Sequence, residues 1–313
     1  MSNRNSDIRI LMKTSLEEAG YRLRRIEKLR SNVFIVQTDN GKFLVKGFGS
    51  NKRLQSQASL TRNLFRNGFD ETYRFIDEIP AFKYGGDTYA FIEYLSGSSR
   101  SFTYDSFSER MEGLDLLEKF HKATSKFYKS LPVSTFDQVR KWEERLDEFQ
   151  GNLPLIRKYM PEDFAKSWVQ WGKVSLKGLK RNEREFYDER QCIVHGDVAD
   201  HNFFRKKSGS LYLIDFDLIA KSPPITDYLQ YANRIMPHIS GSRSLFAHDQ
   251  INRYKRNKGF MYALTYPTDI FREWNRLARD DEFSQGSLHP VWKLSVENAK
   301  RRFRLYEDIS SMR

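Results

Sequence analysis

One short motif, together with the apolar segment that follows it, constrains the fold more than any other part of the sequence. The motif H-G-D-x-x-x-x-N begins at His195 and places Asn202 five positions after Asp197. A second apolar run, residues 211–214, ends at Asp215. Apolar runs of this length predict two strands, with polar side chains in the loop and at the end of the second strand. A solvated turn with chance polar residues is the alternative interpretation, and it requires several coincidences.

The motif resembles the loop of the aminoglycoside phosphotransferase and choline kinase family, which also begins His-Gly-Asp. The resemblance extends over roughly residues 13–237 and is most similar to the CotS-type, spore-coat-associated branch. It implies an α+β, protein-kinase-like fold with two lobes. One lobe is a small antiparallel sheet, and the larger one is mainly helical. Members of the family move the γ-phosphate of ATP to hydroxyl groups of small molecules, with Mg²⁺ as cofactor.

The resemblance also implies roles for the motif residues. Asp197 is expected to be the catalytic base that takes the acceptor's hydroxyl proton. Asn202 and Asp215 are expected to bind Mg²⁺ against the phosphates. Asp217, two positions further on, could assist the metal or the acceptor, or only cap the turn. His195 is expected to brace the loop by hydrogen bonding.

The N-terminal part of the chain predicts a helix over 7–19 followed by short strands at 21–23, 33–37 and 42–46. Asn40-Gly41 predicts the hairpin turn between the last two strands. Lys46, at the end of the third strand, resembles the family lysine that binds the α- and β-phosphates. A surface lysine on an edge strand is the alternative interpretation.

A helix predicted over 52–67 is expected to carry the family's glutamate partner for this lysine, but no glutamate lies between Lys46 and Asp70. Gln57 occupies the best-aligned position. Its side chain could accept a hydrogen bond from Lys46 without supplying a negative charge. A Gln57→Glu variant is therefore expected to hold or improve activity. The turn at residues 30–32, which would cover the phosphates, is not glycine-rich.

An apolar strand at 88–95 runs into a Gly/Ser stretch, which we interpret as the hinge between lobes. By resemblance, backbone groups at Glu93 and Leu95 are expected to bind the adenine. The predicted domains are therefore 1–95, the nucleotide-binding lobe, and 96–313, the lobe with the catalytic loop and metal site. A plain surface loop after a core strand is the alternative.

Helices are predicted at 107–123, 136–149 and 162–187, and the region after residue 228 is predicted to be mainly helical. We interpret their apolar stripes as core rather than as a ligand site. The stripes comprise Trp142, Leu146, Phe149, Phe164, Trp168 and Leu179. By resemblance, the second and third of these helices form the insertion that shapes the acceptor pocket. His121 is expected to be a buried structural residue, and Asp227 a structural anchor.

Composition narrows the remaining choices. The chain has 313 residues and a formal net charge of +12, without a zinc-finger or RNA-recognition motif, so we expect no specific nucleic-acid partner. The single cysteine, Cys192, favours a reducing compartment. No signal peptide or membrane-length apolar run is present, so we expect a cytoplasmic protein, and the resemblance adds the spore coat as a second location.

Two main hypotheses for function follow. The first is an ATP-dependent phosphotransferase acting on an unidentified small-molecule hydroxyl. The second is a catalytically weak or inactive kinase-fold protein that serves as a binding or scaffold component, which Gln57 favours. A nucleic-acid binder is a third hypothesis without a motif behind it. The acceptor and the oligomeric state cannot be read from the sequence, although the basic charge argues mildly against polycationic aminoglycosides as acceptors.

Overall fold

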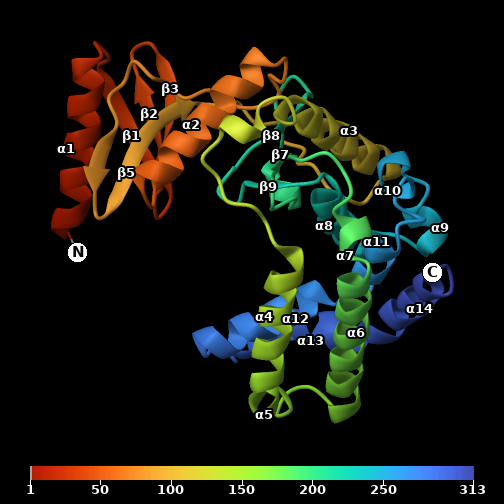
Figure 1. The fold of residues 1–313 in the computed structure, drawn as a ribbon. Helices are drawn as coiled ribbons and strands as arrows, with labels where there is room; N and C mark the ends of the chain where they lie inside the picture. The colour runs from red at the N-terminus through yellow and green to blue at the C-terminus, as the bar shows by residue number, and fades with distance from the viewer. Residues whose placement is uncertain (1) are drawn as a thin grey trace. The chain divides into compact units, whose positions relative to one another are not determined.

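The computed structural model describes residues 2–313, which form two compact units. The first unit contains the chain up to Ser134 together with Ala199–Ile219, and the second contains Thr135–Val198 and Ala220–Arg313. Figure 1 shows the elements of both units along the chain. The predicted lobe boundary after residue 95 stays a prediction. The two units are defined by how densely their residues pack, and such units need not coincide with the nucleotide-binding and catalytic lobes.

The first unit is built on one antiparallel sheet with the strand order β1-β2-β3-β5-β4. Its strands are β1 (Leu23–Arg30), β2 (Val33–Thr38), β3 (Gly41–Phe48), β4 (Phe82–Tyr84) and β5 (Asp87–Glu93). Gly41 directly follows the two-residue turn between β2 and β3 and has a φ of 137°, which confirms the hairpin predicted there. The register pairs Lys46 of β3 with Val33 of β2 and Ala90 of β5.

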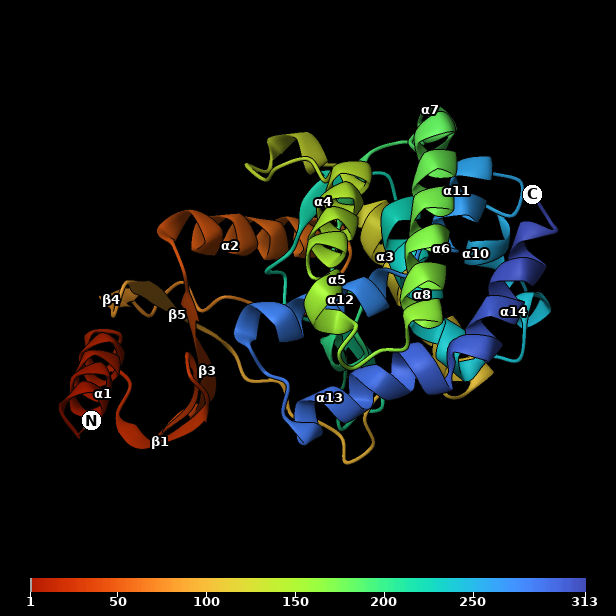
Figure 2. The same ribbon diagram turned by 90° about the horizontal axis from the view of Figure 1, so that it is seen from below.

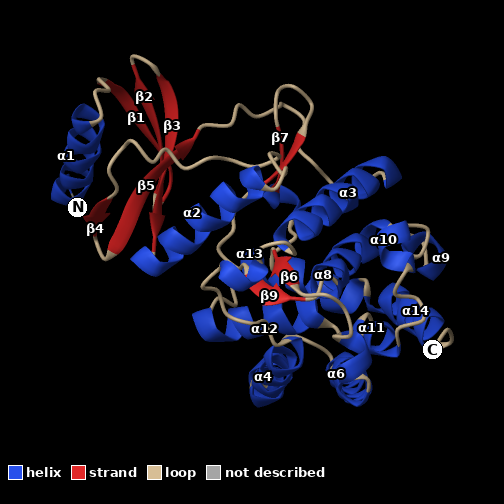
Figure 3. Cartoon of the chain, turned by 45° about the horizontal axis from the view of Figure 1, so that its top comes forward, coloured by secondary structure: helices blue, strands red, loops and turns tan. Residues whose placement is uncertain are grey.

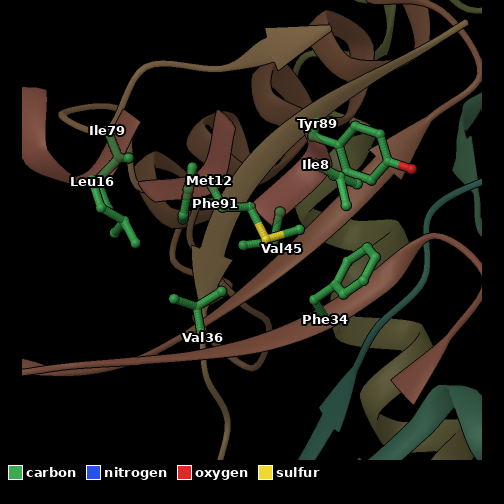
Figure 4. Packing of buried hydrophobic residues seen from close by; sticks show 9 residues of the cluster. All are labelled: Ile8, Met12, Leu16, Phe34, Val36, Val45, Ile79, Tyr89 and Phe91. Atoms are coloured by element: carbon green, nitrogen blue, oxygen red, sulfur yellow. The ribbon is translucent and has the colours of Figure 1, made fainter. Parts of the chain in front are cut away.

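Helix α1 (Ser2–Glu18) packs against this sheet, beside β1 and β4 (Figure 1, Figure 3). Ile8, Met12 and Leu16 recur at every fourth position and are buried, so one face of the helix meets the sheet. Figure 4 shows how the cluster interdigitates. It comprises Ile8, Met12, Leu16, Phe34, Val36, Val45, Ile79, Tyr89 and Phe91. The predicted helix over 7–19 is confirmed, and the observed helix begins earlier.

Two longer helices and a small ribbon complete the first unit. They are α2 (Asn51–Arg66), α3 (Phe107–Thr124), the 3₁₀ turns η1 (Tyr128–Ser130) and η2 (Asp200–Asn202), and the paired strands β7 (Phe203–Arg205) and β8 (Leu211–Leu213). Ser50 caps α2 by accepting a hydrogen bond from the backbone of Arg53 at 3.2 Å. Phe120 of α3 stacks on Phe216, just beyond β8, with ring centroids 5.8 Å apart. This stacking fixes the segment that carries Asp215.

The second unit is mainly helical, with one short two-stranded ribbon of β6 (Cys192–Val194) and β9 (Ala220–Ser222). Its longer helices are α4 (Gln138–Gly151), α6 (Glu162–Arg181), α8 (Ile225–Ile235), α12 (Thr268–Asp280), α13 (Gln285–Trp292) and α14 (Ala299–Ser310). Shorter ones are α5 (Leu153–Ile156), α7 (Glu183–Phe186), η3 (Met236–His238), α9 (Ser242–Leu245), α10 (Asp249–Asn252), α11 (Lys258–Ala263) and the π-helical η4 (Lys293–Glu297). Helices α4 and α6 run side by side in both views (Figure 1, Figure 2).

The aromatic stripes of α4 and α6 form the core of the second unit, as predicted. Trp142 stacks on Tyr266 with ring centroids 4.1 Å apart, and the Tyr266 hydroxyl donates to the Trp142 carbonyl at 2.6 Å. The Trp168 indole donates to the backbone of Ser295 at 2.9 Å. Of the predicted stripe, only Phe164 is half-buried; the other five residues are buried.

The strands on either side of the H-G-D motif pair with other strands, β6 with β9 and β8 with β7. Two predicted helix bounds need correction. The helix predicted over 162–187 ends at Arg181, since the side chain of Asn182 donates to the Gly178 carbonyl at 2.8 Å and Asn182 leaves the helical conformation. The helix predicted from residue 136 begins at Gln138, because Asp137 is its N-cap. No helix in the described chain is long and apolar enough to cross a membrane.

Candidate active site

A cavity of about 590 Å³ opens in the first unit, between its sheet and the segments around β7 and β8. This volume lies within the range of small-molecule and cofactor sites. Its walls are mostly apolar, with a few polar groups at one end. It is lined by Leu29, Arg30, Val33, Ile35, Leu44, Lys46, Tyr73, Ile92, Glu93, Tyr94, Leu95, Gly97, Ser98, His201, Asn202, Phe204, Ile214 and Asp215. Five of the six predicted nucleotide and metal residues line this cavity, and Gln57 is the one that does not.

Lys46 binds two aspartates at the polar end of the cavity. Its Nζ lies 2.8 Å from Asp215 Oδ1 and 3.0 Å from Asp217 Oδ1. The side chain of Lys46 is only 12% exposed, so its charge is largely withdrawn from water. Two carboxylates around one half-buried ammonium compensate that charge. The lysine is thus a core member of the site rather than a surface lysine on an edge strand.

Gln57 does not accept the hydrogen bond expected from Lys46. Its Nε2 instead donates to Asp217 Oδ1 at 2.7 Å, and its Oε1 is buried without a hydrogen-bond partner in the described chain. The expected contact was wrong because both Gln57 and Lys46 bind the same acceptor, Asp217 Oδ1, instead of each other. The negative charge absent from α2 is consequently supplied by Asp217, and Gln57 orients it.

Asp215 has an unusual backbone, with a φ of 67°. Left-handed conformations are uncommon outside glycine and tend to occur at functional sites, where the surrounding structure holds the strain. The backbone of Ile214 donates to the Asn202 carbonyl at 3.0 Å, and this bond joins the strand end to the loop that carries the asparagine. Asn202 and Asp215 are thereby held on the same cavity wall.

Tyr73 is a cavity residue that the sequence reasoning missed. Its hydroxyl is buried and has no hydrogen-bond partner in the described chain. Burial raises the pKa of this phenol well above its usual value, and the charges of Asp215 and Asp217 add to the effect. The hydroxyl therefore stays protonated and can donate a hydrogen bond into the cavity beside the aspartates.

The turn at residues 30–32 meets the cavity without glycine. Arg30 lines the wall, and the Asn32 side chain donates to the Gly47 carbonyl at 3.1 Å while the Gly47 N–H donates back to Asn32 at 2.8 Å. This pair of bonds fixes the turn through a side chain. Glu93 and Leu95 also line the cavity, and the Glu93 N–H is engaged by the Arg74 carbonyl at 2.8 Å.

Asp197 lies in the second unit, on the loop that follows β6. Buried Asp227, at the start of α8, accepts hydrogen bonds from the backbone of His195 at 2.7 Å and of Gly196 at 3.0 Å. The Asp197 N–H donates to His195 Nδ1 at 3.3 Å. These bonds match the expected bracing by His195 and the expected anchoring by Asp227. The loop is rigid, which a group positioned for chemistry requires.

Arg234 of α8 forms an ion pair with Asp197, with Nη2 and Oδ1 3.3 Å apart. Both side chains are half-buried. The sequence signal for this contact was present but weak: Arg234 is one of many basic residues, seven positions after Asp227 on the same helix. The guanidinium occupies one oxygen of the predicted base and places a positive charge beside it.

The oxygen donors of the first unit fit a magnesium ion bound together with a nucleotide. Asn202 and Asp215 offer an amide and a carboxylate oxygen at the polar end of the cavity. Magnesium is commonly held by one or two such protein ligands plus substrate phosphates and water, rather than by a full protein cage. No group of three or more acidic, histidine or cysteine side chains in the described residues forms such a cage.

The fold is shared with solved small-molecule kinases at low sequence identity. An aminoglycoside phosphotransferase from Alicyclobacillus acidocaldarius superposes with a TM-score of 0.71 at 17% identity, covering 92% of each chain. The GDP and kanamycin complex of APH(2")-IIia superposes with a TM-score of 0.68 at 13% identity, covering 94% of this chain and 98% of the other. The choline kinase LicA from Streptococcus pneumoniae gives a TM-score of 0.50 at 16% identity, covering 97% and 99%.

The architecture is therefore the α+β, protein-kinase-like fold, as predicted. The profile of the phosphotransferase enzyme family matches residues 22–264, most of the chain. This protein belongs to that family, whose solved relatives include aminoglycoside phosphotransferases and a choline kinase. Its family is one of phosphotransferase enzymes. No curated protein matches the sequence.

Proposed function

We propose that this protein transfers the γ-phosphoryl group of ATP to a hydroxyl group of a small molecule. The observation that carries the proposal is the ion pair between Lys46 and Asp215, 2.8 Å apart, on the wall of a cavity that Asn202 also lines. An apolar cavity with lysine, aspartate and asparagine at one end suits a nucleotide, whose phosphates would bind at the polar end and whose base would bind at the apolar end.

In this mechanism, Lys46 binds the α- and β-phosphates, and the hinge backbone at Glu93 and Leu95 binds the base. Asn202 and Asp215 would hold Mg²⁺, which would supply positive charge to neutralise the phosphates. The protonated Tyr73 hydroxyl donates a hydrogen bond at the same end of the cavity. Most of the rate enhancement comes from positioning and charge neutralisation.

Asp197 supplies the acid–base step. The acceptor oxygen forms a bond to the γ-phosphorus while the bond from that phosphorus to the bridging oxygen of ADP breaks. The hydroxyl proton passes to the Asp197 carboxylate. Arg234 pairs with one carboxylate oxygen at 3.3 Å and helps to fix the orientation of the side chain. Proton transfer by a positioned carboxylate contributes on the order of 10²–10⁴ in rate.

A scaffold function without turnover is the second candidate, and one observation favours it. Gln57, a neutral residue, stands where the family resemblance implies a charged partner of the lysine. Such a protein would bind nucleotide and keep Asp197 only as a structural residue. The CotS-type assignment, with a spore-coat location, belongs with this candidate and stays a prediction.

Nucleotide binding and turnover separate the two candidates. We expect Mg²⁺ and ATP together to raise the unfolding temperature more than either alone, because the metal ligands act through the phosphates. Ligand at a hundredfold excess over its Kd stabilises by about 2.7 kcal/mol. No shift at millimolar Mg-ATP or Mg-GTP would contradict the nucleotide site.

A metabolite library with ATP and Mg²⁺, scored by ADP release, then tests for turnover. Asp197→Asn is expected to keep Mg-ATP binding and to lose on the order of 10²-fold or more of the activity. Nucleotide binding without any acceptor-dependent ADP release, and without an effect of Asp197→Asn in the host, would favour the scaffold.

A further inference from the structure

A cluster of cations in the second unit lies near the loop that carries Asp197. Lys141 and Arg145 are one turn apart on α4, and Arg272 is on α12, which packs against α4. Burial lowers the pKa of the Lys141 ammonium, and the charges of Arg145 and Arg272 lower it further, whereas the charge of Asp197 raises it. The four groups are therefore close enough to act on one another.

The position of Lys141 is fixed by the core beside the catalytic loop. Its Nζ lies over the ring of Phe136, 4.8 Å from the centroid. Phe136 packs against Cys192 and Val194 of β6, the strand that leads directly into the H-G-D motif. A single stack of side chains thus links the ammonium to the strand that positions Asp197.

The positive charge of Lys141 is only partly balanced, by the charge of Asp197. No carboxylate of the described residues lies within 4.0 Å of its Nζ, whereas Arg272 pairs with Glu273 at 2.9 Å. The Arg145 guanidinium donates to the Thr268 backbone carbonyl at 3.3 Å rather than to an acid. Like charges four positions apart on a helix destabilise it, and partial burial of an ammonium without a contacting carboxylate adds to that cost. An anion at this place would remove both costs.

A cavity of about 200 Å³ opens at the cluster, between α4 and α12. It is lined by Lys141, Glu144, Arg145, Glu148, Arg272, Asn275 and Arg279. Both carboxylates are already engaged: Glu144 by Arg140 at 2.9 Å and Glu148 by Arg279 at 2.7 Å. The space suits one small anionic group rather than a whole substrate, so the rest of a ligand would extend out of it.

We infer that the acceptor of this phosphotransferase is an anionic small molecule, whose phosphate or carboxylate group binds at Lys141, Arg145 and Arg272 while its hydroxyl meets Asp197. The inference rests on the proposed function. Arg234, paired with Asp197, adds a further positive charge on the acceptor's side. A polycation would be repelled here. The anion is assigned to the acceptor because the three cations belong to the second unit, as Asp197 does.

Inorganic phosphate is the probe for the anion site, and its binding requires no turnover. The full-length protein, saturated with Mg-ADP, is titrated with phosphate at constant ionic strength, and affinity is measured by calorimetry and by the unfolding temperature. We expect saturable binding that weakens at least tenfold in Lys141→Gln. Lys173→Gln is the matched control, because it removes an exposed lysine that lines a different basic cavity on α6. Its phosphate affinity should equal that of the wild type.

Three results would overturn the inference. The first is that phosphate does not bind. The second is that it binds equally well to Lys141→Gln, which would indicate general ion effects. The third is that a non-hydrolysable ATP analogue in place of ADP abolishes the phosphate response, which would assign the cluster to the γ-phosphate. Because Mg-ATP binding is measured separately, each of these results leaves the proposed function standing.

The acceptor class is tested directly with paired compounds. Each hydroxyl compound is offered as a neutral form and as its phosphate or carboxylate derivative, together with amine analogues, and ADP release is followed. We expect the anionic members to be phosphorylated and Lys141→Gln to raise their KM with a smaller effect on kcat. Preferential turnover of neutral or cationic members, with a KM insensitive to Lys141→Gln, would refute the inference.

Discussion

Gln57→Glu introduces the residue that the family resemblance implies at this position, yet we expect it to destabilise the protein at neutral pH. In the structure, Gln57 is 2% exposed and its amide donates to Asp217 at 2.7 Å. An ionised glutamate cannot donate this bond, and it would place a second carboxylate against the first. Lys46 is already shared between Asp215 and Asp217, so it offers little further compensation.

The magnitude follows from the proton that the new glutamate would take up. Burial at position 57, with the charge of half-exposed Asp217 beside it, pushes the pKa of the new carboxyl upward, and a protonated glutamate could donate to Asp217 as the amide does. If the pKa of the glutamate rises by roughly two units, the free energy of unfolding falls by about 2.7 kcal/mol above the folded pKa. Because the folded pKa exceeds the unfolded one, the loss is absent below about pH 4, grows as the pH rises between the two values, and is constant above them.

Denaturant unfolding of wild type and Gln57→Glu from pH 4 to pH 8 measures this difference, and Mg-ATP affinity is measured in parallel. The double variant Gln57→Glu, Asp217→Asn is the control. It moves the carboxylate to position 57 and leaves an amide at position 217 that can donate a hydrogen bond to it. The double variant should recover most of the stability. If Gln57→Glu alone is as stable as wild type at pH 8, or binds Mg-ATP more tightly, the glutamate pairs with Lys46 and the expected repulsion from Asp217 is absent.

Three further outcomes are expected. Asp215→Ala should weaken Mg-ATP binding itself, in contrast to Asp197→Asn. An unchanged affinity for Mg-ATP in calorimetry would exclude Asp215 from the metal site. Asp227→Ala should lower the free energy of unfolding by roughly 2–5 kcal/mol, because it leaves two buried backbone N–H groups unpaired; exposed Asp280→Ala is its control, and equal stability of the two would exclude the anchoring role. Duplex DNA should bind weakly, without sequence preference and with a steep salt dependence, which a tight, selective complex in gel-shift assays at physiological salt would contradict.

Much of the fold was predictable where apolar periodicity and turn chemistry agreed. The α1 face of Ile8, Met12 and Leu16 and the turn before Gly41 were both identified from local sequence. Strand β1 was largely missed, because only three residues at 21–23 were predicted and the observed strand is Leu23–Arg30. Six of its eight residues are exposed, so it has no apolar alternation, and its pairing with β2 through the backbone determines its conformation.

The site was predictable in its residues but not in its contacts. The spacing of the motif located Asn202 and Asp215, which share the cavity wall with Lys46. The pairing of Lys46 with Asp217 was not predictable, because these residues lie 171 positions apart and only the folded chain brings them together. Arg234 and Lys141 were missed for a related reason: in a chain with 53 basic residues, no local signal separates a functional cation from a solvated one.

The absence of a glutamate on α2 has less weight against activity than the sequence suggested. A charged partner for the lysine must be close and fixed, but it need not come from that helix. Asp217 lies 3.0 Å from Lys46 and is held by Gln57, so the charge has moved to the strand end and the helix supplies an orienting amide. Because Asp217 is 45% exposed, the pair is partly screened by water and its contribution to stability is small. Its effect is expected in the position of Lys46, and therefore in nucleotide affinity, rather than in the free energy of unfolding.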